Sequence, residues 1–343
     1  MSEQTTEQIQ EQERLGRTAS ATTAPGRRLR LGRLSEVRNL GLIGVLVVLV
    51  VVGALTQPTF LTRSNFLTIL TQGSDIGVVT VGMTFVIIGG GIDLSVGALV
   101  ALASVWATTV ATQGFGTIGM VFCAVTVGMA FGLVNGLLIA YGRIVPFIAT
   151  LAMMATARGL AERISNKQSQ LVTDAGITAI ANTKPLGVPL LVWIFAFVAL
   201  IGWVVLNRTT YGRRTFAVGG NIEAARLAGI NVKRHVASLY VLSGLCCGIA
   251  AIMLASETTT GSSTHGDLYE LNAIAAVIIG GTLLSGGRGS LVGSVLGVLV
   301  FMTISDIFVL NNLQTEVQNI AKGVIIVIAV LLQRRGRAES RST

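Results

Sequence analysis

The chain has 343 residues, of which 52% are apolar and only 12% charged, with a net charge of +9 and a mean hydropathy of +0.73. Soluble proteins carry roughly 25% charged residues. Here 12 of the 41 charged residues lie in the first 38 residues and 5 follow Gln333, which leaves 24 for the 295 residues between them. This shortage excludes a soluble enzyme, a disordered protein and a disulfide-linked secreted module, and it indicates an integral membrane protein.

The N-terminal segment, residues 1–39, is polar and then basic, which predicts a disordered basic cytoplasmic tail. It is not a cleaved signal peptide, because the apolar region begins too late and continues too long. The remaining chain predicts an all-α integral membrane protein with about ten transmembrane helices over residues 40–333, a cytoplasmic loop at 207–235 and a cytoplasmic tail at 334–343. The ten apolar runs are 40–56, 66–88, 94–112, 117–140, 147–164, 188–206, 236–256, 271–283, 290–310 and 317–333.

The distribution of basic residues orients the predicted helices. With the N-terminus inside, 19 of the 25 Lys and Arg residues fall in cytoplasmic segments, against three in outer loops. Cytoplasmic loops of membrane proteins carry this excess. The sequence therefore predicts that both termini are cytoplasmic, and that the basic charge reflects membrane topology and not a nucleic-acid partner.

The motifs of catalysis and cofactor binding are missing from the sequence. No lysine follows a glycine, so there is no phosphate-binding G-x-x-x-x-G-K-[ST] loop. The two histidines form no H-E-x-x-H motif, and the three cysteines lie inside apolar runs without metal-ligand spacing. We expect no cofactor, no metal site and no catalytic residue, so any ATP hydrolysis would belong to another subunit.

A few polar residues lie at membrane depth. Asp93 stands where an apolar run breaks, two residues before Ser95, and it could cap the next helix or act at a gate. Asn135 is a mid-helix amide that needs either an interhelical hydrogen bond or a solute. Asp93, Ser95 and Asn135 are the candidate residues of a translocation path or gate. The carboxylates expected to lie near outer helix ends, in contact with water, are Asp75, Glu257 and Asp306.

Glycine patterns add two further expectations. Gly128, Gly132 and Gly136 lie four apart, a spacing that lets one helix pack closely on another or lines a path. The segment 86–90, Val-Ile-Ile-Gly-Gly, recurs at 277–281. Transporters often contain such internal repeats, although glycine-rich membrane segments also resemble one another by chance.

The cytoplasmic loop at 207–235 contains the signals of a short helix. Asn221 suits the N-cap, Glu223 places negative charge in the first turn, and Gly229 suits the C′ position. Such a helix of about two turns would not be stable in isolation. It must pack on its own chain or on a partner that docks from the cytoplasm.

The same loop resembles a known protein family. Glu223-Ala224-Ala225 followed by Gly229 is similar to the E-A-A-x-x-x-G pattern of coupling loops in permeases of ATP-binding cassette (ABC) importers. Four more segments, together with Gly219-Gly220-Asn221 in front of that pattern, resemble ribose-type sugar permeases, and the resemblance runs from about residue 40 to 332. These segments are 91–97, 135–136 with 146–151, 271–282 and 285–289.

The resemblance implies a permease subunit that carries a monosaccharide such as ribose across the cytoplasmic membrane. Its partners would be a cytoplasmic ABC ATPase, an extracytoplasmic sugar-binding protein, a second permease copy in a homodimer, and membrane lipid. It also implies that seven residues couple the permease to the ATPase: Gly219, Gly220, Asn221, Glu223, Ala224, Ala225 and Gly229.

Three alternatives stand beside this interpretation. A branched-chain amino-acid permease subunit shares a distant version of the pattern, but the segment 91–95 favours sugar. A secondary transporter driven by protons or sodium should show carboxylates or histidines within its spans, whereas Asp93 lies at a break. A membrane enzyme would need catalytic residues that the motif search did not find.

Overall fold

The computed structural model describes residues 27–339. Contacts within the chain separate residues 1–40 from residues 41–343, and helix α2 (Arg27–Thr56) begins in the first of these units. Residues 27–39 are therefore helical, which corrects the predicted disorder for this part of the tail. The correction has a local reason, since Arg and Leu, both strong helix formers, fill most of residues 27–34. The rest of that tail, 1–26, and residues 340–343 lie outside the described residues.

In residues 41–343 the described structure is almost entirely helical, as the sequence predicts. The exception is an antiparallel pairing of β1 (Gln170–Leu171) with β2 (Thr260–Gly261). In chain order the further helices are α3 (Arg63–Ile88), α4 (Val96–Ala107), α5 (Val110–Gln113), α6 (Gly116–Ala140), α7 (Pro146–Ser165), α8 (Ala175–Asn182), η1 (Pro185–Gly187), α9 (Leu190–Arg208), α10 (Thr210–Gly220), α11 (Ile222–Leu227), α12 (Val232–Thr258), α13 (Tyr269–Ile279), α14 (Leu291–Leu310) and α15 (Thr315–Glu339).

Each of the ten predicted apolar runs coincides with a helix, but these helices differ in length. Five of them, α3, α6, α9, α12 and α14, are long and apolar enough to cross a membrane. Helices α4 and α13 have 12 and 11 residues, so each rises roughly 16–18 Å, about half of a hydrocarbon core of roughly 30 Å. The described residues therefore form an all-α membrane protein with five helices of spanning length and with two half-length apolar helices, α4 and α13.

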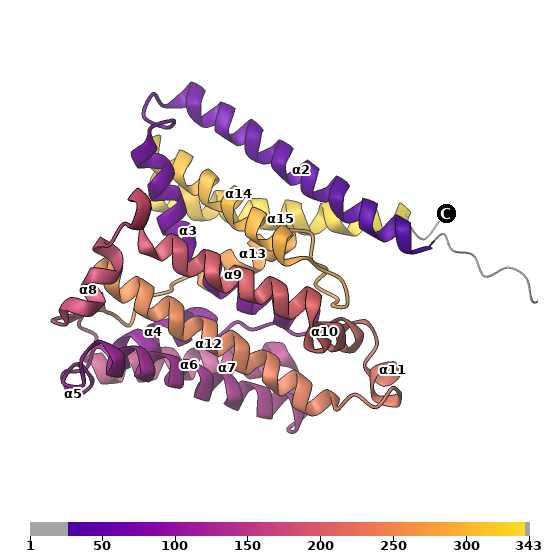
Figure 1. Ribbon diagram of the computed structural model, residues 1–343, viewed down its shortest axis with the longest axis horizontal. Coiled ribbons are helices and arrows are strands. Elements are labelled where there is room, and N and C mark those ends of the chain that lie inside the picture. The colour runs from indigo at the N-terminus through magenta and orange to yellow at the C-terminus, as the bar shows by residue number, and fades with distance from the viewer. Residues whose placement is uncertain (1–26, 340–343) are drawn as a thin grey trace, which may run out of the picture. The chain divides into compact units, whose positions relative to one another are not determined.

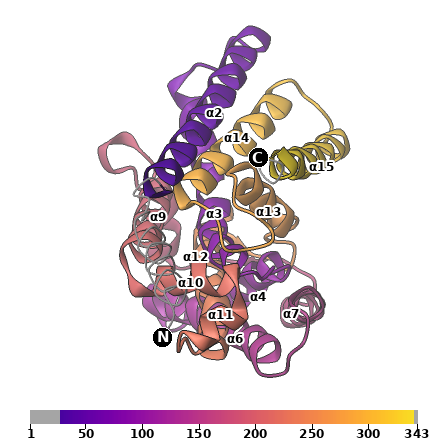
Figure 2. The same cartoon turned by 90° about the vertical axis from the view of Figure 1, so that its right-hand side faces the viewer.

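Helix α3 lies at the centre of this packing. Figure 2 looks along the helices and shows α3 surrounded by α9, α12, α13 and α14, each of which it contacts. Its second half, residues 73–88, is buried without interruption. Helix α4 is buried on every side except at Trp106, which fits a helix that is apolar around its whole circumference.

The predicted glycine ridge packs α6 on α12. A Cβ atom on Gly128 would lie 2.2 Å from the carbonyl oxygen of Gly244, and one on Gly132 would lie 2.4 Å from that of Tyr240. A Cβ on Gly136 would lie 2.7 Å from the Cα of Ala237. The two backbones therefore approach as closely as glycine allows, and of the two roles open to this spacing the structure shows helix packing.

The repeated segment 86–90 and 277–281 has the same structure in both places. Helix α3 ends at Gly89, Gly90 takes a φ of +87°, and the N–H of Gly91 bonds Val86 O at 2.9 Å. Helix α13 ends in the same way, with a φ of +79° at Gly281 and a bond of 3.1 Å from Thr282 N to Val277 O. Both ends are Schellman motifs, in which the left-handed residue favours glycine. Each leads through a non-helical segment to the next helix, α4 or α14.

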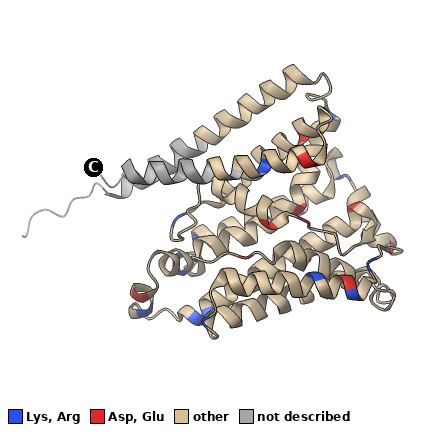
Figure 3. Cartoon of the chain, turned by 180° about the vertical axis from the view of Figure 1, so that it is seen from behind, with Lys and Arg blue, Asp and Glu red and all other residues tan. Residues whose placement is uncertain are grey.

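Charged residues gather at the two ends of the helices, with few between (Figure 3). Helices α10 and α11 lie at one end, and α5 and α8 lie at the opposite end (Figure 1). Glu257 is exposed as expected, but Asp75 and Asp306 are only 4% and 5% exposed, so the prediction of contact with water was wrong for them. The Tyr269 hydroxyl donates to Asp75, and Asn65 Nδ2 donates to Asp306 Oδ2 at 2.8 Å.

Candidate functional site

Helix α11 forms with the ends that the sequence predicts. Asn221 is the N-cap, and its Oδ1 accepts a hydrogen bond from Ala224 N at 3.0 Å. Ala228 is the C-cap, and Gly229 follows with a φ of +81°. Ile230 N closes the end with a 3.1 Å bond to Ala225 O. Local chemistry alone therefore sets both boundaries of this helix.

The surface of α11 is mostly unpartnered in the described chain. Ala225 is the buried residue of the helix, at 3% exposure. Ile222 and Leu227 are 54% and 85% exposed. Glu223 and Arg226 form an exposed ion pair at 3.6 Å, which contributes little stability. A six-residue helix is unstable by itself, so α11 presents apolar side chains where a second surface would stabilise it.

The end of α10 is pressed against two other segments, backbone to backbone. A Cβ on Gly219 would lie 1.8 Å from Ile88 O and 2.7 Å from Gly287 N, and one on Gly287 would lie 2.6 Å from the Cα of Gly220. A Cβ on Gly286 would lie 2.8 Å from the Cα of Gly90. We name this contact the glycine junction; its residues are Ile88, Gly90, Gly219, Gly220, Gly286 and Gly287.

The glycine junction joins three breaks between helices. One real hydrogen bond crosses it, from Gly287 N to Ile88 O at 2.8 Å. Ile88 is the last residue of α3, Gly219 lies in the last turn of α10 just before α11, and Gly287 lies in the loop that leads to α14. The candidate coupling helix is thus attached to the interior by close backbone contact. The sequence did not indicate that these three segments meet.

The three candidate path residues come together beyond the end of α3. Asp93 Oδ1 accepts from Ser95 N at 3.0 Å and from Ser95 Oγ at 2.6 Å, and Asn135 Nδ2 donates to Ser95 Oγ at 2.8 Å. Ser243 of α12, which sequence reasoning missed, donates to Asp93 Oδ2 at 2.9 Å. Asp93, Ser95 and Asn135 have no exposed surface, and Asn135 Oδ1 has no hydrogen-bond partner within residues 27–339. This polar network is closed to solvent in the described conformation.

The network joins three helices around a carboxylate. Asp93 forms an Asx-turn that holds the first residues before α4, where the positive end of that helix favours a negative charge. Asn135 brings α6 to it, and Ser243 brings α12 to it. None of the ion pairs among the described residues includes Asp93. The carboxylate is therefore stabilised by hydrogen-bond donors and the N-terminus of α4, an arrangement that depends on the position of every donor.

The opposite end of the molecule carries its own polar contacts. Arg158 of α7 pairs with Asp267 at 2.8 Å and donates to His265 O at 3.1 Å, which ties α7 to the segment before α13. Asp174 caps α8, and Thr117 Oγ1 donates to its Oδ1 at 2.6 Å. That hydrogen bond, with another from Ile177 N, lowers the pKa of Asp174 below its usual value.

Comparison with known proteins yields one consistent group. The model of the family described as "Branched-chain amino acid transport system / permease component" matches residues 65–330. The ribose import permease protein RbsC of Bacillus subtilis (strain 168) is 40% identical over 88% of this chain and 94% of that protein. The RbsC protein of Escherichia coli (strain K12) is 38% identical over 86% and 92%. The L-arabinose ABC transporter permease protein AraH of Azospirillum brasilense is 35% identical over 98% of each. No solved structure matches the chain significantly.

Proposed function

The chain belongs to the family described as branched-chain amino acid transport system / permease component, and we propose that it is the membrane-spanning permease subunit of an ABC importer for a monosaccharide such as ribose. The sugar is supported by relatives named for ribose and L-arabinose, at 35–40% identity over most of the chain. The family description favours a second candidate cargo, a branched-chain amino acid. The subunit itself has no catalytic role in this proposal.

The observation that carries the proposal is the exposed surface of α11. Ile222 and Leu227 stand out from a helix too short to be stable alone, at the end of the helices that also carries α10 (Figure 1). An ATPase subunit that covers these side chains would both stabilise α11 and move it. In this proposal Asn221, Glu223, Ala224, Ala225 and Gly229 shape the docking helix, and the residues of the glycine junction connect it to the interior.

The proposed topology follows from charge and helix length. The chain would span the cytoplasmic membrane about ten times with both termini in the cytoplasm, and α10 and α11 would lie on the cytoplasmic side. The helices α4 and α13 would reach half-way, and the non-helical segments after Gly90 and Gly281 would lie within protein and not in lipid. An extracytoplasmic sugar-binding protein would meet the opposite end, near α5 and α8. A second permease copy would complete the path.

The proposed mechanism uses the connection between α11 and the buried network. Closure of the ATPase subunits on ATP would displace α11 and the end of α10. Because the glycine junction leaves no space between α10 and the end of α3, that displacement reaches the break that contains Asp93. Opening of the network formed by Asp93, Ser95 and Asn135 would then alternate access to the path.

The test is reconstitution of the permease in lipid vesicles with its ATPase and its binding protein. We expect uptake of labelled ribose or a similar monosaccharide that requires ATP and all three components. Uptake of leucine in place of sugar would assign the second candidate cargo. Uptake by the permease alone, driven by a proton or sodium gradient, would refute the importer and favour a secondary transporter.

The docking role of α11 is tested with Leu227→Asp. A leucine that becomes buried on docking contributes about 1.5–3 kcal/mol, so the variant should bind the ATPase at least about tenfold more weakly. Leu227→Met keeps the apolar surface and is the matched control. Equal affinity of Leu227→Asp, Leu227→Met and the wild type would show that α11 is only a connector.

A further inference from the structure

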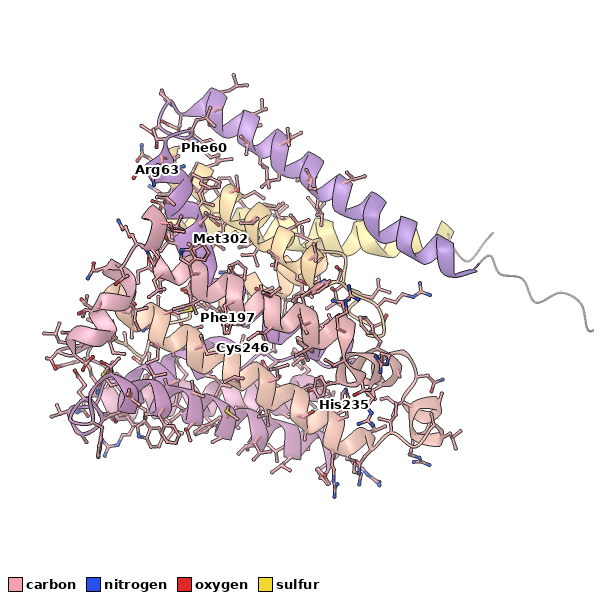
Figure 4. The ribbon with its side chains drawn as sticks, viewed as in Figure 1. Phe60, Arg63, Phe197, His235, Cys246 and Met302 are labelled. Carbon is pink, nitrogen blue, oxygen red and sulfur yellow. The ribbon has the colours of Figure 1, made fainter. Side chains whose placement is uncertain are left out.

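A pocket beside α11 has a chemistry that the coupling proposal does not use. It has a volume of about 320 Å³ and lies between α10, the segment after α11 and the first turns of α12. Figure 4 labels His235 at this end of the helices, among nitrogen-bearing side chains. We name it the basic pocket; its lining residues are Tyr211, Arg214, Ile230, Asn231, Arg234, His235 and Ser238.

The charge of the basic pocket is uniformly positive. Arg214 and Arg234 line it, and no carboxylate does. Neither arginine belongs to any ion pair among the described residues. The N-terminus of α12 adds to this charge, because it opens into the pocket at Asn231, the N-cap of that helix. Two guanidinium groups and a helix N-terminus together favour an anionic guest whose oxygens accept hydrogen bonds, such as a carboxylate.

The inner wall of the basic pocket is ordered by hydrogen bonds. Thr215 Oγ1 donates to Tyr211 O at 3.0 Å, so it must accept from Nε2–H of His235 at 2.9 Å. The ring of Tyr211 lies 4.7 Å from the ring of His235, and its hydroxyl donates to Ser238 Oγ at 2.9 Å, because Ser238 Oγ itself donates to His235 O. The wall is therefore formed before any guest arrives.

His235 forms part of this inner wall. The residue is only 7% exposed, and its Nε2 is hydrogen-bonded to Thr215, so the ring is held in place beside the pocket.

We propose that the basic pocket receives a carboxylate side chain, Asp or Glu, of the ATPase subunit. This inference rests on the proposed function and extends it. The pocket adjoins α11, whose two charged residues, Glu223 and Arg226, pair with each other. The exposed side chains of Ile222 and Leu227 therefore offer apolar contacts, which do not fix the orientation of a partner by charge. A carboxylate between Arg214 and Arg234 would fix the position of the ATPase on the permease, as charge complementarity does at interfaces.

Glutamine variants test the proposal by measured affinity. Arg214→Gln and Arg234→Gln should each weaken ATPase binding by at least about tenfold, and the double variant should lose less than the product, because both residues hold one guest. Arg213→Gln on α10 and Lys233→Gln on α12 are matched controls outside the pocket, and their affinity should stay within about threefold of wild type. Both pocket arginines are exposed, so loss of folding is not expected, and thermal unfolding of each variant confirms this.

A crosslink then identifies the guest. Arg214→Lys places an amine in the pocket, and a carbodiimide activates a neighbouring carboxylate, which the amine attacks to form an amide with release of a urea. We expect a crosslink to one acidic residue of the ATPase, and none from Arg213→Lys. Wild-type affinity in both glutamine variants, or equal crosslinking from both lysine variants, would overturn the proposal. Failure of the wild-type permease to bind the ATPase would instead refute the proposed function.

Discussion

The glycine junction predicts a sharp effect of one methyl group. In Gly219→Ala the new Cβ would lie 1.8 Å from Ile88 O and 2.7 Å from Gly287 N, where ordinary contacts begin near 3.4 Å. All of the opposing atoms belong to the backbone, so no rotamer change relieves the overlap. The end of α10 must move by roughly 1.5 Å, and overpacking of this kind costs about 1–3 kcal/mol or more.

A second contribution comes from the hydrogen bond that crosses the junction. Gly287 N donates to Ile88 O at 2.8 Å, and the methyl group of Gly219→Ala would lie beside this bond, 1.8 Å from the acceptor and 2.7 Å from the donor, so these atoms must move apart. Loss of that bond adds about 0.5–1.5 kcal/mol. The sum is several kcal/mol of strain at one contact, which we expect to separate α10 from the end of α3 without unfolding the long apolar helices.

The expected phenotype is therefore uncoupling. Gly219→Ala should keep near-normal ATPase binding, since α11 is untouched, and should lose at least about tenfold in ATP-driven uptake in the reconstituted system. The neighbouring variant Gly220→Ala is the matched control, because its Cβ would meet nothing within 4 Å. Full uptake by Gly219→Ala, or equal loss in Gly220→Ala, would refute the role of the junction.

Three further predictions address other parts of the molecule. Asp93→Ala removes the acceptor of three buried donors, two from Ser95 and one from Ser243, and should lower the free energy of unfolding by several kcal/mol; an unchanged melting temperature would contradict this. Because the pKa of Asp174 is lowered from 3.8, its contribution to the stability of α8 is present above about pH 4 and is lost as pH falls below it. Proteolysis near α8 should accordingly rise in acid for the wild type, whereas Asp174→Asn should show no such pH dependence. Arg30→Cys and Arg337→Cys should resist an impermeant thiol reagent in intact cells, and ready labelling of either would overturn the cytoplasmic assignment of that terminus.

The helix positions and helix ends that the sequence predicts are those determined by residues close together in the chain. The ends of α11 follow from Asn221 and Gly229, each of which acts within three residues of its own position. The Schellman ends of α3 and α13 follow in the same way from paired glycines. Apolar runs place the helices, because burial in lipid or protein requires them wherever they occur in the chain.

What the sequence does not predict depends on partners far away along the chain. The positions of Asp75 and Asp306 near helix ends favour contact with water, but their donors, Tyr269 and Asn65, lie 194 and 241 positions away. Ser243 reaches Asp93 across 150 positions. No local pattern distinguishes such a residue from an ordinary helix serine, so the polar network could be named in part but not completed.

The repeat and the glycine junction together explain why one short helix could act on two breaks at once. The end of α3, at Ile88 and Gly90, and the loop that follows the matching end of α13, at Gly286 and Gly287, are hydrogen-bonded to each other and packed on the same turn of α10. A displacement of that turn must therefore be accommodated by both loops, because neither can yield without the other. Since α4 begins beyond one loop and α14 beyond the other, the proposed coupling motion that enters at α11 would pass to both α4 and α14 through a single point of backbone contact.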